Sequence, residues 1–340
     1  MSRLRSNPPN RFDPTEVEWD TAPPRARLEV TEDHSRSILA RNDSPDVGFT
    51  WSVNPYRGCL HGCAYCYARP SHEYLGLGAG TDFETRILVK PEAPRLLAEA
   101  FRKPSWRGEA VAFSGVVDCY QAIERTWRVT RRCLEVCRDH RNPVGIITRS
   151  DLVTRDLDLL VALNEVRAVR VTFSLPLLDA ETCQALEPWA PAPSRRLAAM
   201  RALSEAGIPV GVNIAPILPT LTEPQIPAIL EAARDHGARW AHRILLRLPG
   251  AVATVFEERL RERLPLRADA VLAKQRRLRG GRLNDPRFRS RGRGEGPEWE
   301  TVCQLFDLWH RKLGYAPMPP SPDPSPFRRP PEGGQLGLFG

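Results

Sequence analysis

Six short apolar runs alternate with helical segments between residues 48 and 250, and this alternation constrains the fold more than any other feature of the chain. The runs are rich in strand-forming residues, whereas the segments between them repeat their apolar residues with the helical period. Strands joined through helices run parallel, because a tight turn joins only antiparallel strands. The predicted strands are 48–53, 110–113, 144–148, 168–174, 210–214 and 242–246.

The predicted helices complete the domain organisation. They lie at 94–101, 124–140, 154–164, 194–205, 223–236, 251–263 and 297–313. The alternation predicts an α/β protein with a partial (β/α)6 TIM-like barrel at 42–250, since no seventh or eighth strand for the alternative, a complete barrel, is visible. We expect a partly disordered extension at 1–41, a helical and basic C-terminal appendix at 251–316, and a Pro-rich linker with a disordered tail at 317–340.

Three cysteines, Cys59, Cys63 and Cys66, follow the first predicted strand at short spacing. Gly58 and Gly62 relax the backbone before two of them, so the three thiolates can face one inorganic centre. A cubane iron–sulfur cluster normally takes four cysteines, so a site with three leaves one iron open. Structural zinc is the alternative, but it needs four ligands, usually as two separated pairs, and no second pair follows. The chain length and the absence of an apolar signal core disfavour a disulfide framework.

The C-x-x-x-C-x-x-C pattern, with Tyr65 before its third cysteine, resembles the radical S-adenosylmethionine (SAM) superfamily. The longer run from Asn54 to Pro70 resembles the branch related to spore photoproduct lyase, often labelled DNA repair photolyase, and the likeness extends over about 41–315. The resemblance implies a [4Fe-4S] cluster on the three cysteines and SAM on the open iron. It also implies an electron donor such as flavodoxin or ferredoxin.

The activity implied by the resemblance is reductive cleavage of SAM to methionine and a 5′-deoxyadenosyl radical. The implied enzyme is bacterial and lyase-like, and acts on DNA in a repair-type reaction. Because the sequence shows neither a membrane helix nor a lipidation signal, we expect it to be cytoplasmic. Two alternatives remain open. One is a radical SAM enzyme that acts on RNA, protein or a small molecule, and the other is a non-catalytic iron–sulfur protein that binds DNA.

Polar residues end several predicted strands, which is where barrel proteins build their active sites. In the resembled superfamily, a Gly-containing motif after the second strand contacts the amino group of SAM. Its glycine-glycine-glutamate form is replaced here by Ser-Gly-Val-Val-Asp, which ends at Asp118. For each serine or asparagine, a hydrogen-bonded turn is the alternative role. The predicted cofactor-binding residues are Tyr65, beside the adenine by resemblance only, and Ser114, Gly115, Ser150, Ser174 and Asn213.

Cys119 is the candidate catalytic residue. It lies just after the second predicted strand, near the radical that the resemblance implies, and spore photoproduct lyases use a cysteine as hydrogen-atom donor. An inert buried thiol is the alternative, because free cysteines are among the most buried residues. Cys133 and Cys137 share one face of a predicted helix and are expected to serve packing alone.

The net charge of +8 is concentrated in one segment. Between Arg259 and Arg293 there are thirteen Arg or Lys residues and three acids, a surplus of ten, so the rest of the chain is slightly acidic. Such a concentration predicts a surface that binds a polyanion. We expect this polyanion to be a nucleic acid, above all DNA. A solvated arginine-rich segment is the alternative, because the chain uses Arg far more often than Lys throughout.

The segment from Gln335 to Phe339, Gln-Leu-Gly-Leu-Phe, resembles the short peptide by which bacterial repair and replication proteins bind the sliding clamp. Two large apolar side chains beyond a Pro-rich linker are suited to an apolar pocket on a partner. A chance match and a tail folded onto its own barrel are the alternatives. No stretch approaches the ~20 apolar residues that a membrane helix needs, so we expect no membrane partner.

Overall fold

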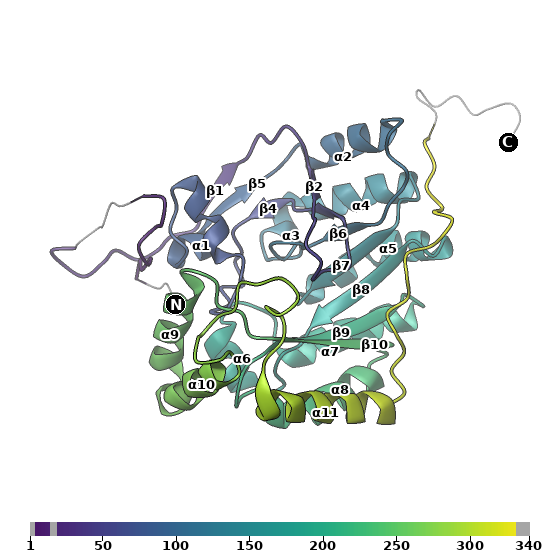
Figure 1. Ribbon diagram of the computed structural model, residues 1–340. Helices are drawn as coiled ribbons and strands as arrows, with labels where there is room; N and C mark the ends of the chain where they lie inside the picture. Colours follow the sequence, from purple (N-terminus) through teal and green to yellow (C-terminus); the bar gives the residue numbers. More distant parts are fainter. Residues whose placement is uncertain (1–3, 14–18, 331–340) are drawn as a thin grey trace, which may run out of the picture.

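A seven-stranded sheet forms the centre of the protein, in the order β10-β9-β8-β7-β6-β3-β2. The structure, a computed structural model, describes residues 4–13 and 19–330 (Figure 1). The strands from β3 to β10 run parallel, and β2 pairs antiparallel with β3 at one edge. The bounds are β2 (Leu39–Arg41), β3 (Trp51–Val53), β6 (Val111–Phe113), β7 (Val144–Thr148), β8 (Val169–Ser174), β9 (Val210–Ile217) and β10 (Trp240–Leu245).

The six parallel strands are the six predicted from the sequence, which confirms the α/β fold class and the partial barrel. Each is hydrogen-bonded to the next parallel strand along the chain, and at least one helix lies between them. Within the described residues, β2 and β10 are the two edges of this sheet, so it stays open. Close packing fixes one residue of β9, because a Cβ on Gly211 would lie 2.1 Å from a ring atom of Trp240 on β10.

Helices cover the outer face of the sheet. α2, α4 and α5 pack in sequence along one part of it, α7, α8 and α11 along another, and α9 contacts both α6 and α10 (Figure 1). None of the described helices combines the length and apolarity that a membrane crossing requires. The bounds are α1 (Thr81–Thr85), α2 (Ala93–Arg102), α3 (Glu124–Trp127), α4 (Val129–Asp139), α5 (Leu157–Glu165), α6 (Ala180–Leu186), α7 (Pro193–Glu205), α8 (Ile226–Asp235), α9 (Val252–Arg263), α10 (Pro265–Arg277) and α11 (Gly296–Lys312).

A second, three-stranded sheet was not predicted from the sequence. It has the order β1-β5-β4, with β1 at Glu29–Glu32, β4 at Tyr56–Arg57 and β5 at Arg86–Val89. Both β1 and β2 lie within the segment 1–41, for which the sequence predicted only a polar, partly disordered extension. Part of this extension is therefore built into the two sheets, and β5 supplies the edge on which β1 forms.

The single helix predicted at 124–140 is wrong, because the structure divides it into α3 and α4. Arg128 lies between them with a φ of 50°, in the left-handed region that ends a helix. The carboxylate of Glu124 accepts hydrogen bonds from the backbone N–H groups of Thr130 (2.9 Å) and Arg131 (3.2 Å). This carboxylate therefore caps the start of α4, an interaction that helical periodicity cannot reveal. The helices α6 and α10 were likewise not predicted.

The segment 317–330 is extended, as predicted, but it lies against the protein instead of linking freely. The ring of Phe327 stacks on His140 with the ring centroids 6.3 Å apart. The guanidinium of Arg329 donates a hydrogen bond to the carbonyl of Trp106 (2.6 Å), and Ser325 donates to that of Gly108 (2.7 Å). The proline-rich segment is thus a strap that packs against the segments preceding β6 and β7. The predicted clamp peptide from Gln335 to Phe339 lies outside the described residues.

Candidate active site

The three cysteines lie in one loop that begins directly after β4, beyond the carboxyl end of β3. Gly58 (φ 77°) and Gly62 (φ 64°) adopt left-handed conformations that glycine accepts without strain. Two backbone hydrogen bonds of 3.3 Å fold the loop, from Gly62 N–H to the carbonyl of Cys59 and from Cys66 N–H to that of Cys63. The sequence therefore places all three thiols on a tightly turned backbone.

Arg69 holds this loop from within. Its side chain is fully buried, and it donates hydrogen bonds to the carbonyls of Cys63 (2.7 Å), Ala79 (3.0 Å) and Gly80 (2.9 Å). It also forms an ion pair with Glu84 at 2.5 Å, which balances the buried charge. Five guanidinium donors in a fixed plane suit this role, because several carbonyls converge on one point.

Gln121 holds the loop from the opposite side. Its side-chain amide donates to the carbonyl of Gly58 (3.0 Å) and accepts from the N–H of Leu60 (2.8 Å). Gln121 follows β6, so this pair of bonds ties the cysteine loop to the second parallel strand. Side chains of Arg69 and Gln121 thus support the backbone of the loop, and such support favours a well-defined ligand geometry.

The donor set fits a cubane cluster. All eight cysteines are free, and burial, Asp118 and Cys66 raise the pKa of Cys59 to about 12. Thiolates at such a site need a positive partner, and cluster irons supply it. In the described residues no three His, Cys, Asp or Glu side chains converge closely enough for a single metal ion. A cubane binds each cysteine through a different iron, so its ligands stand farther apart.

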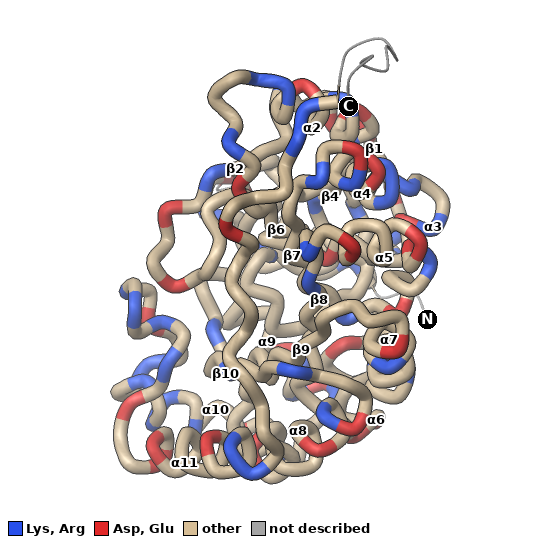
Figure 2. Tube along the Cα trace, turned by 90° about the vertical axis from the view of Figure 1, so that its right-hand side faces the viewer, with Lys and Arg blue, Asp and Glu red and all other residues tan. Residues whose placement is uncertain are grey.

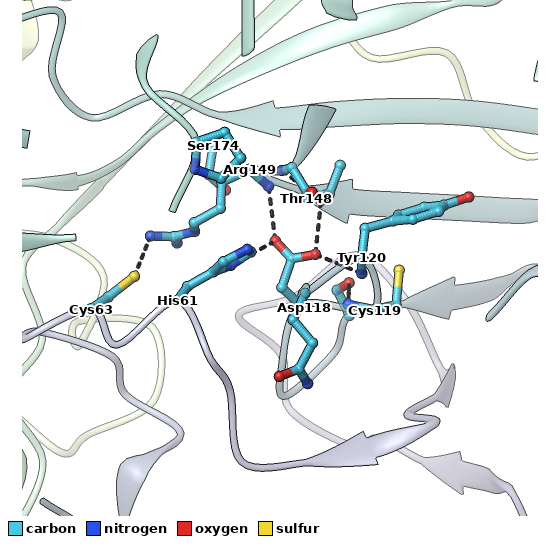
Figure 3. A network of polar contacts seen from close by, with 12 residues as sticks. His61, Cys63, Asp118, Cys119, Tyr120, Thr148, Arg149 and Ser174 are labelled. Atoms are coloured by element: carbon cyan, nitrogen blue, oxygen red, sulfur yellow. Dashed lines mark hydrogen bonds and ion pairs between the residues drawn. The ribbon is translucent and has the colours of Figure 1, made fainter. Parts of the chain in front are cut away.

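Asp118 joins the cysteine loop to the ends of the neighbouring strands (Figure 3). Its carboxylate accepts hydrogen bonds from the hydroxyl of Thr148 (2.8 Å) and the N–H of Arg149 (2.9 Å), at the end of β7. Nδ1 of His61, inside the cysteine loop, lies 3.6 Å from the same carboxylate. Burial lowers the pKa of His61 to about 4 although Asp118 opposes this shift, so the imidazole is neutral near pH 7.

A buried charged network forms the wall behind Cys63. The guanidinium of Arg149 donates to Sγ of Cys63 (2.8 Å) and forms an ion pair with Glu187 (3.0 Å), as Figure 3 shows for the sulfur contact. Glu187 also binds Arg196, and the hydroxyl of Tyr65 donates to it. Burial opposes ionisation of Glu187, but Arg196 and Arg149 outweigh it and lower its pKa to about 2. The carboxylate is therefore charged and orients Arg149 toward the sulfur.

The model of the family described as Radical SAM superfamily matches residues 53–233, more than half of the chain. The chain belongs to this superfamily. The match begins at the end of β3 and ends in α8, so it includes the cysteine loop and the strands that surround it. Members of the radical SAM superfamily use SAM and an iron–sulfur cluster, which agrees with the donor set of the loop.

Similar proteins are found in bacteria and archaea. An uncharacterized protein of Mycobacterium tuberculosis is 39% identical over 175 residues, which cover 52% of this chain and 52% of that protein. An uncharacterized protein of Methanocaldococcus jannaschii is 30% identical over 182 residues, 54% of this chain and 66% of that protein. The chain spans about half the length of the mycobacterial relative that it matches.

Solved structures of spore photoproduct lyase share the fold. The complex with a dinucleoside spore photoproduct superposes with a TM-score of 0.62 at 16% identity, covering 84% of this chain and 80% of that one. A variant of the same lyase with bound AdoMet and the dinucleoside has a TM-score of 0.60 with the same coverage. At this level of identity the likeness shows the radical SAM fold alone.

The predicted cofactor-binding serines end strands β6 to β8, and two of them also serve local turns. Ser114 has a φ of 70°, and its hydroxyl accepts the N–H of Cys119 (2.8 Å). The hydroxyl of Ser150 accepts the N–H of Leu152 (3.2 Å) and caps the short helix η3 (Asp151–Asp156). The contact of these serines with SAM stays a prediction.

The other predicted cofactor-binding residues are Ser174, Asn213, Gly115 and Tyr65, and the structure places only the first two side by side. Ser174 and Asn213 lie opposite each other in the register of β8 and β9, so they share the same edge of the sheet. Gly115 lies close to β3, where a Cβ would be 2.9 Å from that of Ser52. Tyr65 is buried, and its hydroxyl points to Glu187. Contact of these residues with SAM also stays a prediction.

Cys119 lies in the hydrophobic core with no exposed surface. Its carbonyl accepts a hydrogen bond from the hydroxyl of Thr130 (2.7 Å), and Figure 3 shows it on the far side of Asp118 from Cys63. Burial and Asp118 raise the pKa of the Cys119 thiol well above its usual range, so the thiol keeps its hydrogen. Its role as hydrogen-atom donor stays a prediction.

The basic segment divides into two parts. On α9 and α10 many cations have carboxylate partners, whereas basic residues also gather in the loop before α11, at lower left in Figure 2. Arg279 is buried and donates to the carbonyls of Leu246 (2.7 Å), Arg291 (2.8 Å) and Arg293 (2.8 Å), so it serves the loop internally. The ion pairs of the described segment are Arg259–Glu84, Arg261–Glu257, Arg261–Asp269, Arg263–Glu262, Lys274–Glu223, Lys274–Glu298, Arg277–Glu298, Arg287–Asp285, Arg287–Glu295 and Arg291–Asp46.

Several site residues escaped prediction from the sequence. Arg149 directly precedes Ser150, a strand-end residue that the sequence did single out. In a chain so rich in arginine, one more arginine carries little signal. Glu187 and Arg196 lie on segments outside the predicted strand ends, and only the fold brings them to the cysteine loop.

Proposed function

We propose that this radical SAM protein cleaves SAM reductively at a [4Fe-4S] cluster and acts on DNA. The observation that carries the proposal is the braced loop of three cysteines, with Cys59 and Cys63 buried, at the carboxyl ends of the parallel strands. When bound, the reduced cluster supplies the electron that cleaves SAM to methionine and a 5′-deoxyadenosyl radical. A purely structural cluster gains nothing from a site with three cysteines, which leaves one iron open.

The residues of the chain have distinct tasks in this proposal. Cys59, Cys63 and Cys66 hold the cluster, and Arg149 donates a hydrogen bond to the sulfur of Cys63. The strand ends that carry Ser174 and Asn213 face the same edge, where their side chains hydrogen-bond the carboxylate or ribose of SAM. The buried wall of charges excludes water from one side of the site, which protects a reactive intermediate.

The assignment of DNA has two supports. The fold is shared with spore photoproduct lyase, which has been solved with a dinucleoside spore photoproduct. Two arginines lie near the cysteine loop, since Arg291, in the loop that precedes α11, and Arg247, just beyond β10, both interact electrostatically with Tyr67 next to Cys66. RNA, protein and small-molecule substrates, and a non-catalytic DNA-binding role, are the other outcomes of the test.

The test is anaerobic reconstitution followed by detection of 5′-deoxyadenosine, first without substrate and then with deuterated DNA or RNA. Deuterium in the 5′-deoxyadenosine from DNA alone supports the proposal. A Cys59→Ala, Cys63→Ala, Cys66→Ala variant should lose the cluster absorbance and SAM cleavage, whereas Cys133→Ala, in a buried position on α4, should keep both. Native iron content in the triple variant would contradict the assignment of the ligands.

We also propose two protein partners. A flavodoxin or ferredoxin supplies the electron, as the superfamily requires. A bacterial sliding clamp binds the segment from Gln335 to Phe339, on the strength of its sequence alone. Calorimetric titration of a peptide covering 332–340 against a clamp tests the second partner. No binding, or binding that survives Leu338→Ala with Phe339→Ala, would remove the clamp.

A further inference from the structure

A strip of aromatic and cationic side chains leads away from the cysteine loop. It begins at Tyr67, the residue directly after Cys66. The hydroxyl of Tyr67 donates a hydrogen bond to the carbonyl of Gly115 (2.9 Å). The guanidinium of Arg247, just beyond β10, lies 5.8 Å from the centre of the Tyr67 ring. Arg291 follows, with its guanidinium 4.5 Å from the centre of the Phe288 ring. We call these four residues, Tyr67, Arg247, Arg291 and Phe288, the rim strip.

The aromatic members of the rim strip are open to solvent. Tyr67 is 49% exposed and Phe288 57% exposed, and Val116, which follows the Gly115 that Tyr67 contacts, is 39% exposed. Exposed aromatic side chains that gather with cations beside a candidate site are typical of an interaction surface. Aromatic rings in such a place offer flat faces for stacking.

The cationic members carry more positive charge than their neighbours balance. In the described part of the chain, Arg291 forms an ion pair with Asp46, whereas no carboxylate lies within ion-pair distance of Arg247. The Nε atom of Arg247 is buried without a hydrogen-bond partner. Burial and the neighbouring cation of Arg291 lower the pKa of Arg247, so an anion placed beside it would be favourable.

We propose that the rim strip binds an unpaired stretch of a nucleic acid strand, with its phosphodiester on Arg247 and its bases on Phe288 and Tyr67. This inference rests on the proposed function and deepens it. In a duplex the base faces are already stacked, so exposed aromatic rings next to cations match an unpaired strand better than a duplex. Because Tyr67 adjoins Cys66, a base on this ring lies next to the cluster site.

The binding test uses the reconstituted holoenzyme without SAM, under anaerobic conditions, with fluorescently labelled oligothymidylate and a matched duplex. Phe288→Ala should weaken binding of the single strand by about 5-fold to 150-fold, which corresponds to the ~1–3 kcal/mol of one base on an aromatic ring. Duplex binding should change little. Phe12→Ala is the matched control, because Phe12 is 55% exposed and lies under the guanidinium of Arg11 at 4.6 Å.

A salt titration tests the phosphate contact independently. Arg247→Gln should reduce the slope of log affinity against log salt by about 0.7 on the single strand, the value for one neutralised phosphate. Three results would contradict the proposed binding site. They are tighter binding to duplex than to single strand, an unchanged affinity of Phe288→Ala for the single strand, and displacement of the bound single strand by polyglutamate as effective as that by unlabelled oligothymidylate. These readouts need no turnover, so they can fail while DNA-dependent deuterium transfer succeeds, and they can succeed while that transfer fails.

Discussion

Replacing Glu187 with Gln should destabilise the protein by about 3 kcal/mol near pH 7 while keeping the shape of the side chain. Two estimates agree on this magnitude. A carboxyl whose pKa falls from 4.5 to about 2 on folding contributes about 3 kcal/mol to the free energy of unfolding. Removal of one partner from a buried ion pair costs ~3–5 kcal/mol, and Glu187 lies between Arg149 and Arg196.

The pH dependence distinguishes the charge from simple packing. The pKa of Glu187 is lower in the folded state, so its stabilising contribution is complete above the unfolded pKa near 4.5 and declines as the pH falls toward 2. The difference between wild type and Glu187→Gln should therefore shrink to about 1 kcal/mol near pH 3. Guanidinium titrations of the cluster-free protein at several pH values measure this difference.

Glu135→Gln is the control for this measurement. Glu135 forms an ion pair with Arg131 at 3.5 Å with a side chain that is 39% exposed, so its removal should cost less than about 1 kcal/mol. A loss below ~1 kcal/mol for Glu187→Gln near pH 7, or a loss that stays constant down to pH 3, would refute the assigned charge of Glu187.

Three further changes test other parts of the molecule. Arg69→Met should destabilise the protein by about 3–5 kcal/mol, because Glu84 loses an ion pair and three carbonyls lose a donor. It should also lower the iron content after reconstitution, and an unchanged iron content would show that Arg69 does not support the cysteine loop. Cys119→Ala should keep the cluster and SAM cleavage but abolish a thiyl signal under turnover, and full product formation by this variant would exclude the donor role. Phe327→Ala should lower the free energy of unfolding by about 1–2 kcal/mol, less than the loss for a fully buried Phe. It should also speed proteolysis within 317–330. Unaltered cleavage would mean that the stacking of Phe327 on His140 does not hold the strap.

The parallel sheet was predictable because its strands carry their signal locally. A run such as Val144–Thr148 is apolar, β-branched and bounded by helical segments, and its neighbours in the sheet are also its neighbours along the chain. The second sheet had no such signal. The strand β1 pairs with β5, in a register from Glu29 to Arg86, so its partner lies far along the chain and its own side chains are exposed.

The cluster ligands were predictable for the same reason, whereas their supports were not. Cys59, Cys63 and Cys66 lie within eight residues, and their spacing alone defines the site. Arg149 reaches Cys63 across 86 positions of sequence, and Glu187 reaches Tyr65 across 122. No local pattern marks either contact, because each depends on how the strand ends meet.

The basic segment has fewer cations free to bind a polyanion than its net charge suggests. The reason lies in the chemistry of arginine. A guanidinium carries five donors in one plane, so it can satisfy several carbonyls that no other side chain would reach together. Arg279 is used in this way, because it donates to the carbonyls of Arg291 and Arg293 within the loop. The same loop is also fastened to β10, since the carbonyl of Gly292 accepts a hydrogen bond from the N–H of Leu245 (3.0 Å).

Across the opening of the sheet, the N–H of Arg289 donates to Asp46 (2.6 Å), in the segment that follows the opposite edge strand, β2. The arginine-rich loop therefore spans the gap between β10 and β2 with hydrogen bonds and an ion pair instead of strand pairing. Cations used in this bridge are not available for phosphate. The capacity to bind a polyanion thus depends on cations outside this bridge, and in the described residues Arg247, just beyond β10, is such a cation beside the cysteine loop.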